Sequence, residues 1–386
     1  MKITRLLART VPLRTDIRNA VVSFARMTAT IVKVETDVVR AGRPVVGYGF
    51  GSIGRYAATA IIEDRIAPRL LASTPDAYCD ETSENLDPLR AWPIMMRDEK
   101  PGGHGERSVA VGAVDMALWD LAAKIAGRPL WQLLSERFNQ GQHDDRVSVY
   151  AAGGYYHETG GIDALRREIA GYRAMGYVSA KIKIGGASLA EDMDRITAAA
   201  AEIGGPARLA VDANARFDLA AARAYATELA AAGVRWFEEP GDPLDYGLQA
   251  QLSAEFPTLP FATGENLFSH QDVRNLARHA GLDPARSTLQ MDPVLSYGLP
   301  EYLRTLEVLR AAGWSPRRCI PHGGHQFSLH LAAGLQLGGN EAYPGVFRPL
   351  GGFADDTVVS DGTVRLPDVP GIGIELKNDL HHLFQE

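Results

Sequence analysis

The chain has 386 residues, and 40 Lys and Arg stand against 47 Asp and Glu, a formal net charge of −7 at pH 7. This length predicts two or three domains. The acidic balance argues against a nucleic-acid partner, because phosphate binding needs an excess of basic residues. Hydrophobic residues make up 46% of the chain and charged residues 23%, which is typical of a folded globular protein.

The two cysteines, Cys79 and Cys319, and the absence of a CxxC motif predict a reducing, cytoplasmic setting rather than a disulfide framework. The first residues, MKITRLLARTVPLRTDIRN, carry charges throughout and lack the apolar core of a secretory signal. No apolar run is long enough to cross a bilayer. We therefore expect a cytoplasmic protein with no membrane partner.

The N-terminal third mixes strands and helices. A hairpin is predicted from two strand-like segments joined by a short turn, residues 28–39 and 43–51. Helical spacing is found over residues 56–71 and 109–126. The segment RDEKPGGHGER (97–107) is charged and rich in glycine, which predicts a loop and our first candidate for a segment that closes over a site.

From residue 146 onward, a short apolar strand, a polar residue and an amphipathic helix recur about eight times. Three of these helices end in similar glycine motifs, RAMGYV, AAAGVRW and RAAGWS, as expected for a left-handed residue after the last turn. Such alternation predicts parallel strands with crossover helices, hence a (β/α)₈-type barrel, with an open doubly wound sheet as the alternative. The tail is too short for a domain and is expected to pack on the N-terminal part.

A charged or polar residue stands at the end of each of these strands except the first. The steps from Lys183 to His322 are 29, 26, 27, 27 and 30 residues, which is one strand–helix unit per step. Because barrel strands are parallel, all these groups point to one open face, where barrel active sites lie. The set comprises Lys181, Lys183, Asp212, Glu238, Glu265, Asp292, His322 and Glu341.

Three consecutive strands end in the carboxylates Asp212, Glu238 and Glu265. Converging carboxylates repel one another, and a hard divalent cation with oxygen ligands, Mg²⁺, resolves that repulsion. The alternative is that each carboxylate caps a helix or pairs with an arginine. Three in register favour the metal site.

Lys181 and Lys183 are two residues apart on one strand, so both side chains point to the same face. Adjacent ammonium groups, with a cation nearby, are expected to lower each other's pKa and so provide a neutral amine base. Asn214, two residues after Asp212, shares the direction of that carboxylate and is expected to contact substrate or a metal-bound water.

Asp292 and His322 end two later strands, and an aspartate that accepts from a histidine fixes its tautomer and supports its charged form. This pair is a candidate acid. His325 in HGGHQ is the competing histidine, and the HxxH spacing is only a weak zinc signal because no further ligand stands at the right distance.

Residues 49–54, GFGSIG, match the GxGxxG pattern of dinucleotide sites. The acidic residue at the end of a second parallel strand is missing, and the preceding strand belongs to a hairpin, so a loop that closes over a site is the better interpretation.

The motifs KIKIGG, VDAN, FEEP and TGEN with the Asp–His pair resemble the enolase superfamily, mandelate racemase group, over essentially the whole chain. DEKPGGHGERSVAVG, YAAGGYY, LSYGL, SPRRCIPHGGHQ and LGGNEAYP most resemble the D-tartrate dehydratases of that group. The resemblance implies a (β/α)₇β TIM-type barrel over residues 140–350. It also implies an α+β capping domain formed by residues 1–135 and the tail 355–386.

The resemblance further implies site roles. Asp212, Glu238 and Glu265 would hold one Mg²⁺ per subunit, Lys183 would be the base with Lys181 as its electrostatic helper, and His322 with Asp292 would be the acid. Substrate contacts are expected from Asn19, Lys100, Tyr155, Asn214, Glu341 and His325. Ile53 stands where the tartrate enzymes carry a substrate-contacting Asn, a departure that bears on the substrate and not on the chemistry.

The implied reaction is hydro-lyase chemistry on a small hydroxy diacid, with D-tartrate to oxaloacetate as the specific expectation. Lys183 would remove the α-proton, Mg²⁺ would stabilise the enediolate, and His322 would assist loss of the β-hydroxyl. The alternatives are dehydration of another acid sugar, a mandelate-racemase-type 1,1-proton transfer and, more remotely, a non-catalytic diacid-binding barrel. A homo-oligomer is expected.

Overall fold

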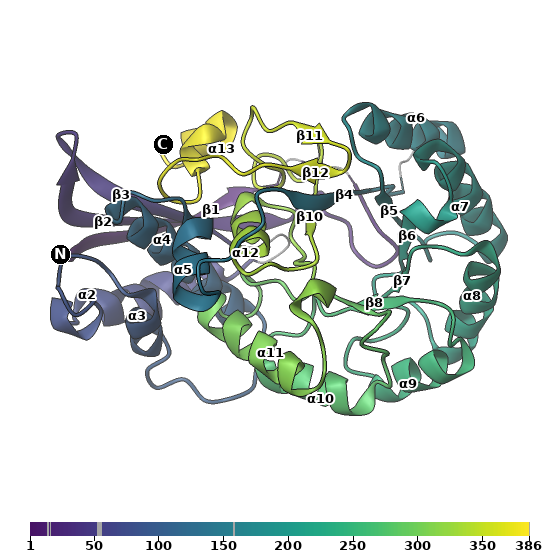
Figure 1. Ribbon diagram of the computed structural model, residues 1–386, viewed down its shortest axis with the longest axis horizontal. Helices are drawn as coiled ribbons and strands as arrows, with labels where there is room; N and C mark the ends of the chain where they lie inside the picture. The colour runs from purple at the N-terminus through teal and green to yellow at the C-terminus, as the bar shows by residue number, and fades with distance from the viewer. Residues whose placement is uncertain (14, 16, 52–55, 157–158, 386) are drawn as a thin grey trace.

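The computed structural model describes residues 1–13, 15, 17–51, 56–156 and 159–385. The chain forms an N-terminal cap beside a barrel whose helices run around the outside of its strands (Figure 1). The predicted α/β architecture, a TIM-type barrel with an α+β cap, is confirmed.

The cap is built on an antiparallel three-stranded sheet in the order β1-β2-β3. The predicted hairpin is confirmed as β2 (Thr28–Arg40) and β3 (Arg43–Phe50). β1 (Ile3–Pro12), which the sequence analysis did not assign, pairs antiparallel with β2. The strand before the GxGxxG motif is therefore antiparallel to its neighbour, as expected, and residues 52–55 of that motif, Ile53 among them, lie outside the described residues.

Helix α4 packs its length against this sheet and is buried nearly all round. Residues 56–71 are helical from Ala58 to Leu71, as predicted, with a π-helical turn in the middle, and α4 begins three residues before the predicted start. The helical segments of the cap are α1 (Ala58–Ile61), the π-turn (Ile62–Ile66), α2 (Ala67–Leu71), α3 (Pro88–Met95), α4 (Glu106–Ile125) and α5 (Leu130–Phe138).

Two glycines of β3, Gly47 and the first glycine of the GxGxxG segment, Gly49, serve packing in this protein. A Cβ placed on Gly49 would lie 2.2 Å from the carbonyl oxygen of Ala113, and one on Gly47 would lie 2.1 Å from that of Ala117. Both carbonyls belong to α4, so only glycine lets β3 approach the helix backbone this closely.

Gly49→Ala is therefore expected to lower the free energy of unfolding by about 1–3 kcal/mol, because the α4 backbone has to move away from the new methyl group. Gly171→Ala is the matched control, since a Cβ there meets nothing within 4 Å and the residue lies inside helix α6. The control is expected to gain up to about 1 kcal/mol. Urea unfolding measures both, and equal stability of Gly49→Ala and the parent protein would contradict this packing role.

The barrel strands are parallel and follow one another in chain order. The seventh predicted strand is shorter than expected: Cys319 forms an isolated parallel bridge to Leu289, and the next strand pairs with the first, which closes the barrel. The strands are β4 (Val147–Gly153), β5 (Ala180–Lys183), β6 (Leu209–Asp212), β7 (Phe237–Glu238), β8 (Phe261–Thr263), β9 (Thr288–Leu289) and β10 (Asn340–Ala342).

Side-chain caps define several of the outer helices. Ser188, Asp218, Asp245 and Ser269 each accept a hydrogen bond from the first turn. The predicted helix-ending glycines, 176, 233 and 313, have φ of +97°, +71° and +84°, the left-handed region that glycine adopts at least cost. The helices are α6 (Gly161–Ala174), α7 (Leu189–Ile203), α8 (Leu219–Ala232), α9 (Tyr246–Glu255), α10 (His270–His279), α11 (Leu299–Ala311) and α12 (Gln326–Gly334).

The C-terminal tail divides between the two parts of the molecule. Its hairpin, β11 (Val359–Ser360) and β12 (Thr363–Val364), pairs antiparallel with β4 and so extends the barrel sheet. The last helix, α13 (Asn378–Leu383), is followed by Phe384, whose ring lies 4.7 Å from that of Tyr48 in the cap. The expected packing on the cap therefore holds for the end of the tail only. The division into residues 1–135 with 355–386 and residues 140–350 stays a prediction.

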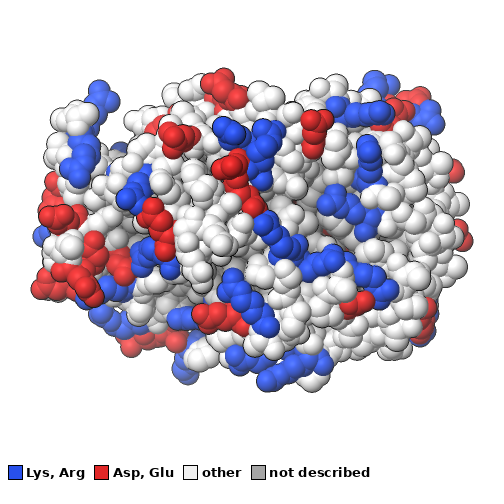
Figure 2. Space-filling model, viewed as in Figure 1, with Lys and Arg blue, Asp and Glu red and all other residues white. Residues whose placement is uncertain are grey.

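Among the described residues, no helix combines the length and the apolar character needed to cross a membrane. On the face shown in Figure 2, acidic and basic side chains both occur over the cap and over the barrel helices.

Candidate active site

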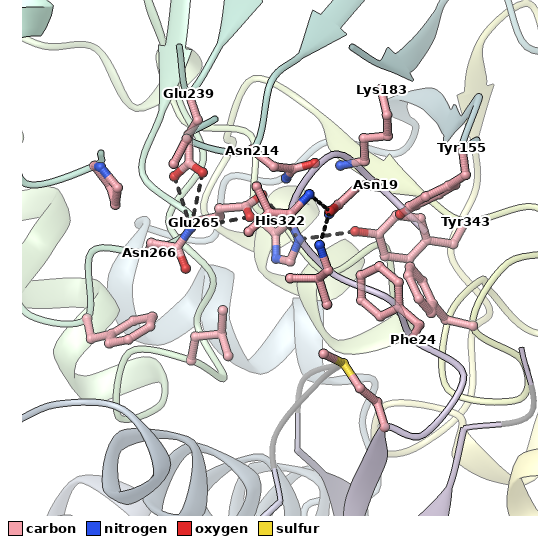
Figure 3. Close-up of a pocket in the computed structure, with 18 residues that line it drawn as sticks. Asn19, Phe24, Tyr155, Lys183, Asn214, Glu239, Glu265, Asn266, His322 and Tyr343 are labelled. Atoms are coloured by element: carbon pink, nitrogen blue, oxygen red, sulfur yellow. Dashed lines mark hydrogen bonds and ion pairs between the residues drawn. The ribbon is translucent and has the colours of Figure 1, made fainter. Parts of the chain in front are cut away.

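A cavity of about 390 Å³ lies at the carboxyl ends of the barrel strands (Figure 3). Residues 17–27 of the cap contribute to its wall and are tied to the barrel through backbone pairing of Arg18 with Tyr156. Most polar residues of the wall come from the barrel, and its apolar residues come from both the cap and the barrel. Its polar members are Asn19, Tyr155, Lys183, Asn214, Glu239, Glu265, Asn266, His322 and Tyr343, and its apolar members include Val22, Phe24, Met27, Phe268, Leu295 and Phe347.

The three predicted metal ligands meet at one point. One carboxylate oxygen from each of Asp212, Glu238 and Glu265 lies within 4.8 Å of the others. Burial raises the pKa of Glu238, and the carboxylates of Asp212 and Glu265 raise it further. Oε2 of Glu265 is buried without a hydrogen-bond donor within the described part of the chain. Three carboxylates that converge as an all-oxygen donor set, one of them with an oxygen that accepts no hydrogen bond within the described residues, fit Mg²⁺.

No arginine pairs with these carboxylates among the described residues; lysines do. Nζ of Lys183 lies 2.5 Å from Oδ2 of Asp212, and Nζ of Lys181 lies 2.5 Å from Oε1 of Glu238. Burial alone would raise the pKa of Asp212, but the two ammonium groups outweigh it and lower that pKa to about 2.

The carboxylates beside the two lysines oppose the predicted lowering of the lysine pKa values. Burial alone would lower the pKa of Lys183, yet the carboxylate of Asp212 outweighs burial and raises it. Burial acts likewise on Lys181, where Glu238 and Glu341 raise the pKa. The predicted lowering rested on the neighbouring ammonium group and a nearby cation, and the carboxylates at the next strand ends act in the opposite direction. A cation shared by the triad reduces that negative charge beside the amines.

The predicted Asp–His pair is present. Nδ1 of His322 lies 2.9 Å from Oδ2 of Asp292, and Nε2 lies 3.1 Å from the hydroxyl of Tyr343. Burial alone would lower the pKa of His322, but Glu265, Glu341 and the hydrogen bond to Asp292 raise it to about 10. These contacts favour the charged, proton-donating form of the imidazole.

His325 has a different position from the one predicted. It lies outside the cavity lining and caps helix α12, where its Nδ1 accepts from the backbone N–H of Ser328. Burial lowers its pKa to about 4. His322 therefore lines the cavity, whereas His325 caps helix α12.

Glu341 lies beneath the cavity rather than in its wall. It is fully buried, with Oε1 at 2.8 Å from Nζ of Lys181 and Oε2 accepting from the backbone N–H of Gly323. Its predicted contact with substrate stays a prediction, whereas its visible contacts hold Lys181 and the loop that carries His322.

Asn19, Tyr155 and Asn214 line the cavity as expected. Oδ1 of Asn19 accepts from the backbone of Val21 and Val22, which leaves its amide N–H₂ as the donor for a ligand. Asn214 has φ of +47°, in the left-handed region that asparagine tolerates better than most residues, and its Oδ1 is a buried acceptor with no partner within the described residues.

Lys100 is not brought to this cavity. It is exposed in the segment 97–105, which the structure confirms as irregular, whereas the last two residues of the predicted loop, Glu106 and Arg107, begin α4. The carboxylate of Glu99 anchors the loop to Arg65, Arg69 and Arg107. A substrate contact from Lys100 stays a prediction.

Sequence reasoning assigned no role to three further polar residues of the wall, Glu239, Asn266 and Tyr343. Glu239 follows the ligand Glu238, with φ of +39°, and both its oxygens accept from Nδ2 of Asn266 at 3.1 Å. The hydroxyl of Tyr343 lies 3.1 Å from Nε2 of His322. All three stood in motifs already noted, FEEP, TGEN and LGGNEAYP. The available signal was their place directly after a strand-end carboxylate for Glu239 and Asn266, and two positions after Glu341 for Tyr343.

Two family models match the chain. Residues 2–135 match the mandelate racemase / muconate lactonizing enzyme N-terminal domain, and residues 164–380 match the enolase C-terminal domain-like family. The chain belongs to the mandelate racemase and muconate lactonizing enzyme group of the enolase superfamily. The family predicted from the sequence is confirmed.

Its relatives in that superfamily include acid-sugar enzymes. The chain is 29% identical over 378 residues to the L-talarate/galactarate dehydratase of Salmonella typhimurium, covering 97% of this chain and 88% of that protein. It is 33% identical to the 3,6-anhydro-alpha-L-galactonate cycloisomerase of Streptomyces coelicolor, covering 74% of this chain and 75% of the other.

A solved structure shares the architecture and carries a metal. The L-talarate dehydratase of Polaromonas, in complex with Mg and L-glucarate, superposes with a TM-score of 0.76 at 28% identity, covering 96% of this chain and 94% of that one. A relative that holds Mg and the buried triad in this chain together bear out the predicted Mg²⁺ site.

Proposed function

We propose that this protein is a Mg²⁺-dependent dehydratase of acid sugars. The observation that carries the proposal is the arrangement of the barrel ends: a triad of carboxylates, flanked along the sheet by Lys183 on the preceding strand and by the Asp292–His322 pair on the following ones. Dehydratases among the relatives support the reaction class.

Each part of the proposed reaction is assigned to particular side chains of this protein. Asp212, Glu238 and Glu265 would hold Mg²⁺, which when bound stabilises negative charge on the substrate carboxylate. Lys183, whose Nζ points into the cavity, takes the α-proton, and Lys181 adds positive charge beneath it. His322, aligned by Asp292, supplies the proton with which the β-hydroxyl leaves as water. The enol that remains ketonises to a 2-keto acid.

The specific substrate we propose is D-tartrate, with oxaloacetate as product. The motifs around the loop 97–107 and around LGGNEAYP favour it. A longer aldaric or aldonic acid is the second candidate, favoured by the talarate/galactarate and arabinonate dehydratases among the relatives.

Purified protein with Mg²⁺ is expected to convert at least one member of a panel of D-tartrate, L-tartrate, galactarate, L-talarate and D-arabinonate into a 2-keto acid. Proton NMR in D₂O and trapping of the keto product with semicarbazide measure the conversion, and EDTA is expected to abolish it. Loss of optical rotation without a keto product would favour the 1,1-proton transfer alternative. Binding of every diacid without turnover would favour a non-catalytic barrel.

A further inference from the structure

The hydroxyl of Tyr343 occupies the position from which His322 would deliver a proton. A carboxylate only accepts hydrogen bonds, so Nδ1 of His322 donates to Asp292 at 2.9 Å. Nε2 is then the only ring nitrogen left for proton delivery to the cavity. At 3.1 Å from Nε2 lies the hydroxyl of Tyr343, a cavity-lining side chain (Figure 3).

We propose that Tyr343 is a catalytic residue whose hydroxyl passes the proton from His322 to the leaving hydroxyl of the substrate. As the C–O bond breaks, the departing oxygen takes the Tyr343 proton and leaves as water. The Tyr343 oxygen then takes the Nε2 proton of His322, so the phenol is restored and the imidazole becomes neutral. The α-proton stays on Lys183, so the step balances. This inference rests on the proposed dehydratase function.

The position of this ring is determined by its surroundings. A Cβ on Gly324 would lie 2.7 Å from the Tyr343 ring, and one on Gly351 would lie 3.1 Å from its Cβ, so both sites admit only glycine without a shift. Phe347 packs edge-on against the ring, with centroids 5.1 Å apart. A ring held this tightly keeps its hydroxyl within reach of His322.

The loop that carries Tyr343 is also held from behind. The buried ammonium of Lys377 donates to the carbonyl oxygens of Gly351 and Phe353, and the backbone N–H of Gly352 donates to Gly324 at 2.7 Å. The loop with Tyr343 and the loop with His322 therefore form one unit. Such support is expected where a proton transfer needs a fixed donor–acceptor distance.

Tyr343→Phe separates the proton relay from packing, because it keeps the ring and removes the oxygen. The variant is expected to lose about 100-fold or more in the rate of dehydration. It should retain exchange of the substrate α-proton with D₂O, since that exchange needs Lys183 and not the acid. Both rates come from one proton NMR time course. Tyr302→Phe is the control, because the Tyr302 hydroxyl is buried on α11 without a partner in the described part of the chain.

Dehydration at the parent rate in Tyr343→Phe would overturn the inference while leaving the proposed function intact, and so would an equal fall of exchange and dehydration. Parent protein that performs neither reaction on any acid sugar would overturn the proposed function and this inference with it.

Site-specific replacement of Tyr343 by 3-fluorotyrosine distinguishes proton transfer from mere orientation of His322. The fluorinated phenol has nearly the same shape and is a stronger acid, so the dehydration rate is expected to rise about two- to five-fold while α-proton exchange stays constant. An unchanged dehydration rate would overturn the relay and reduce Tyr343 to a positioning residue.

Discussion

Lys183→Ala is expected to abolish both dehydration and α-proton exchange, with losses of about 10³- to 10⁴-fold, because the variant has no base beside the substrate α-carbon. Steady-state assay of the keto product and NMR in D₂O measure the two losses. Binding of Mg²⁺ should survive, since removing the ammonium 2.5 Å from Asp212 frees that carboxylate for the metal.

Lys183→Arg is the matched control for charge and packing. The guanidinium can keep the ion pair with Asp212 but does not deprotonate near neutral pH, so it cannot serve as a base. We expect this variant to be as inactive as Lys183→Ala. Normal turnover by Lys183→Arg would mean that Lys183 contributes charge only and that another group removes the proton.

Glu265→Gln is expected to weaken Mg²⁺ binding by about 100-fold or more, because the site loses one of its three negative ligands and the remaining two cannot compensate. Glu265 is the most informative member of the triad. Its closest contacts are Asn266 at 3.4 Å and His322 at 3.5 Å, so its replacement breaks no lysine ion pair. Calorimetric titration with Mg²⁺ and the metal dependence of turnover measure the effect.

Glu307→Gln makes the same change of charge on the exposed surface of α11 and should bind Mg²⁺ like the parent protein. Equal affinity of Glu265→Gln and Glu307→Gln would remove Glu265 from the metal site.

The barrel and its site were predictable because the candidate site residues recur with the same spacing as the strands that carry them. Residues spaced by 26 to 30 positions end successive parallel strands, so Asp212, Glu238 and Glu265 had to converge whatever the details of the loops. The hairpin β2–β3 and the glycine-terminated helices followed from local chemistry in the same way.

The parts that sequence reasoning missed depend on long-range contacts. β1 has irregular alternation, with a register shift near Ile3, so its pairing with β2 decides its state more than its own pattern does. The β11–β12 hairpin has two-residue strands that exist only because β4 offers an edge.

The pKa shifts of the lysines and the roles of the two histidines were harder to predict from the sequence. The pKa of Lys183 depends on Asp212 across the sheet, which a count of neighbours along one strand does not include. His322 and His325 are three residues apart, and helix α12 begins directly after His325, which makes His325 the helix cap and leaves His322 in the cavity lining.

A crystal structure of the Lys183→Ala variant with Mg²⁺ and D-tartrate tests the central claim most directly. We predict one ion bound to oxygens of Asp212, Glu238 and Glu265 and to the substrate carboxylate. The truncated side chain at position 183 should face the α-carbon, and the His322–Tyr343 pair should face the β-hydroxyl. An ion elsewhere, or a substrate whose α-carbon points away from position 183, would contradict the account.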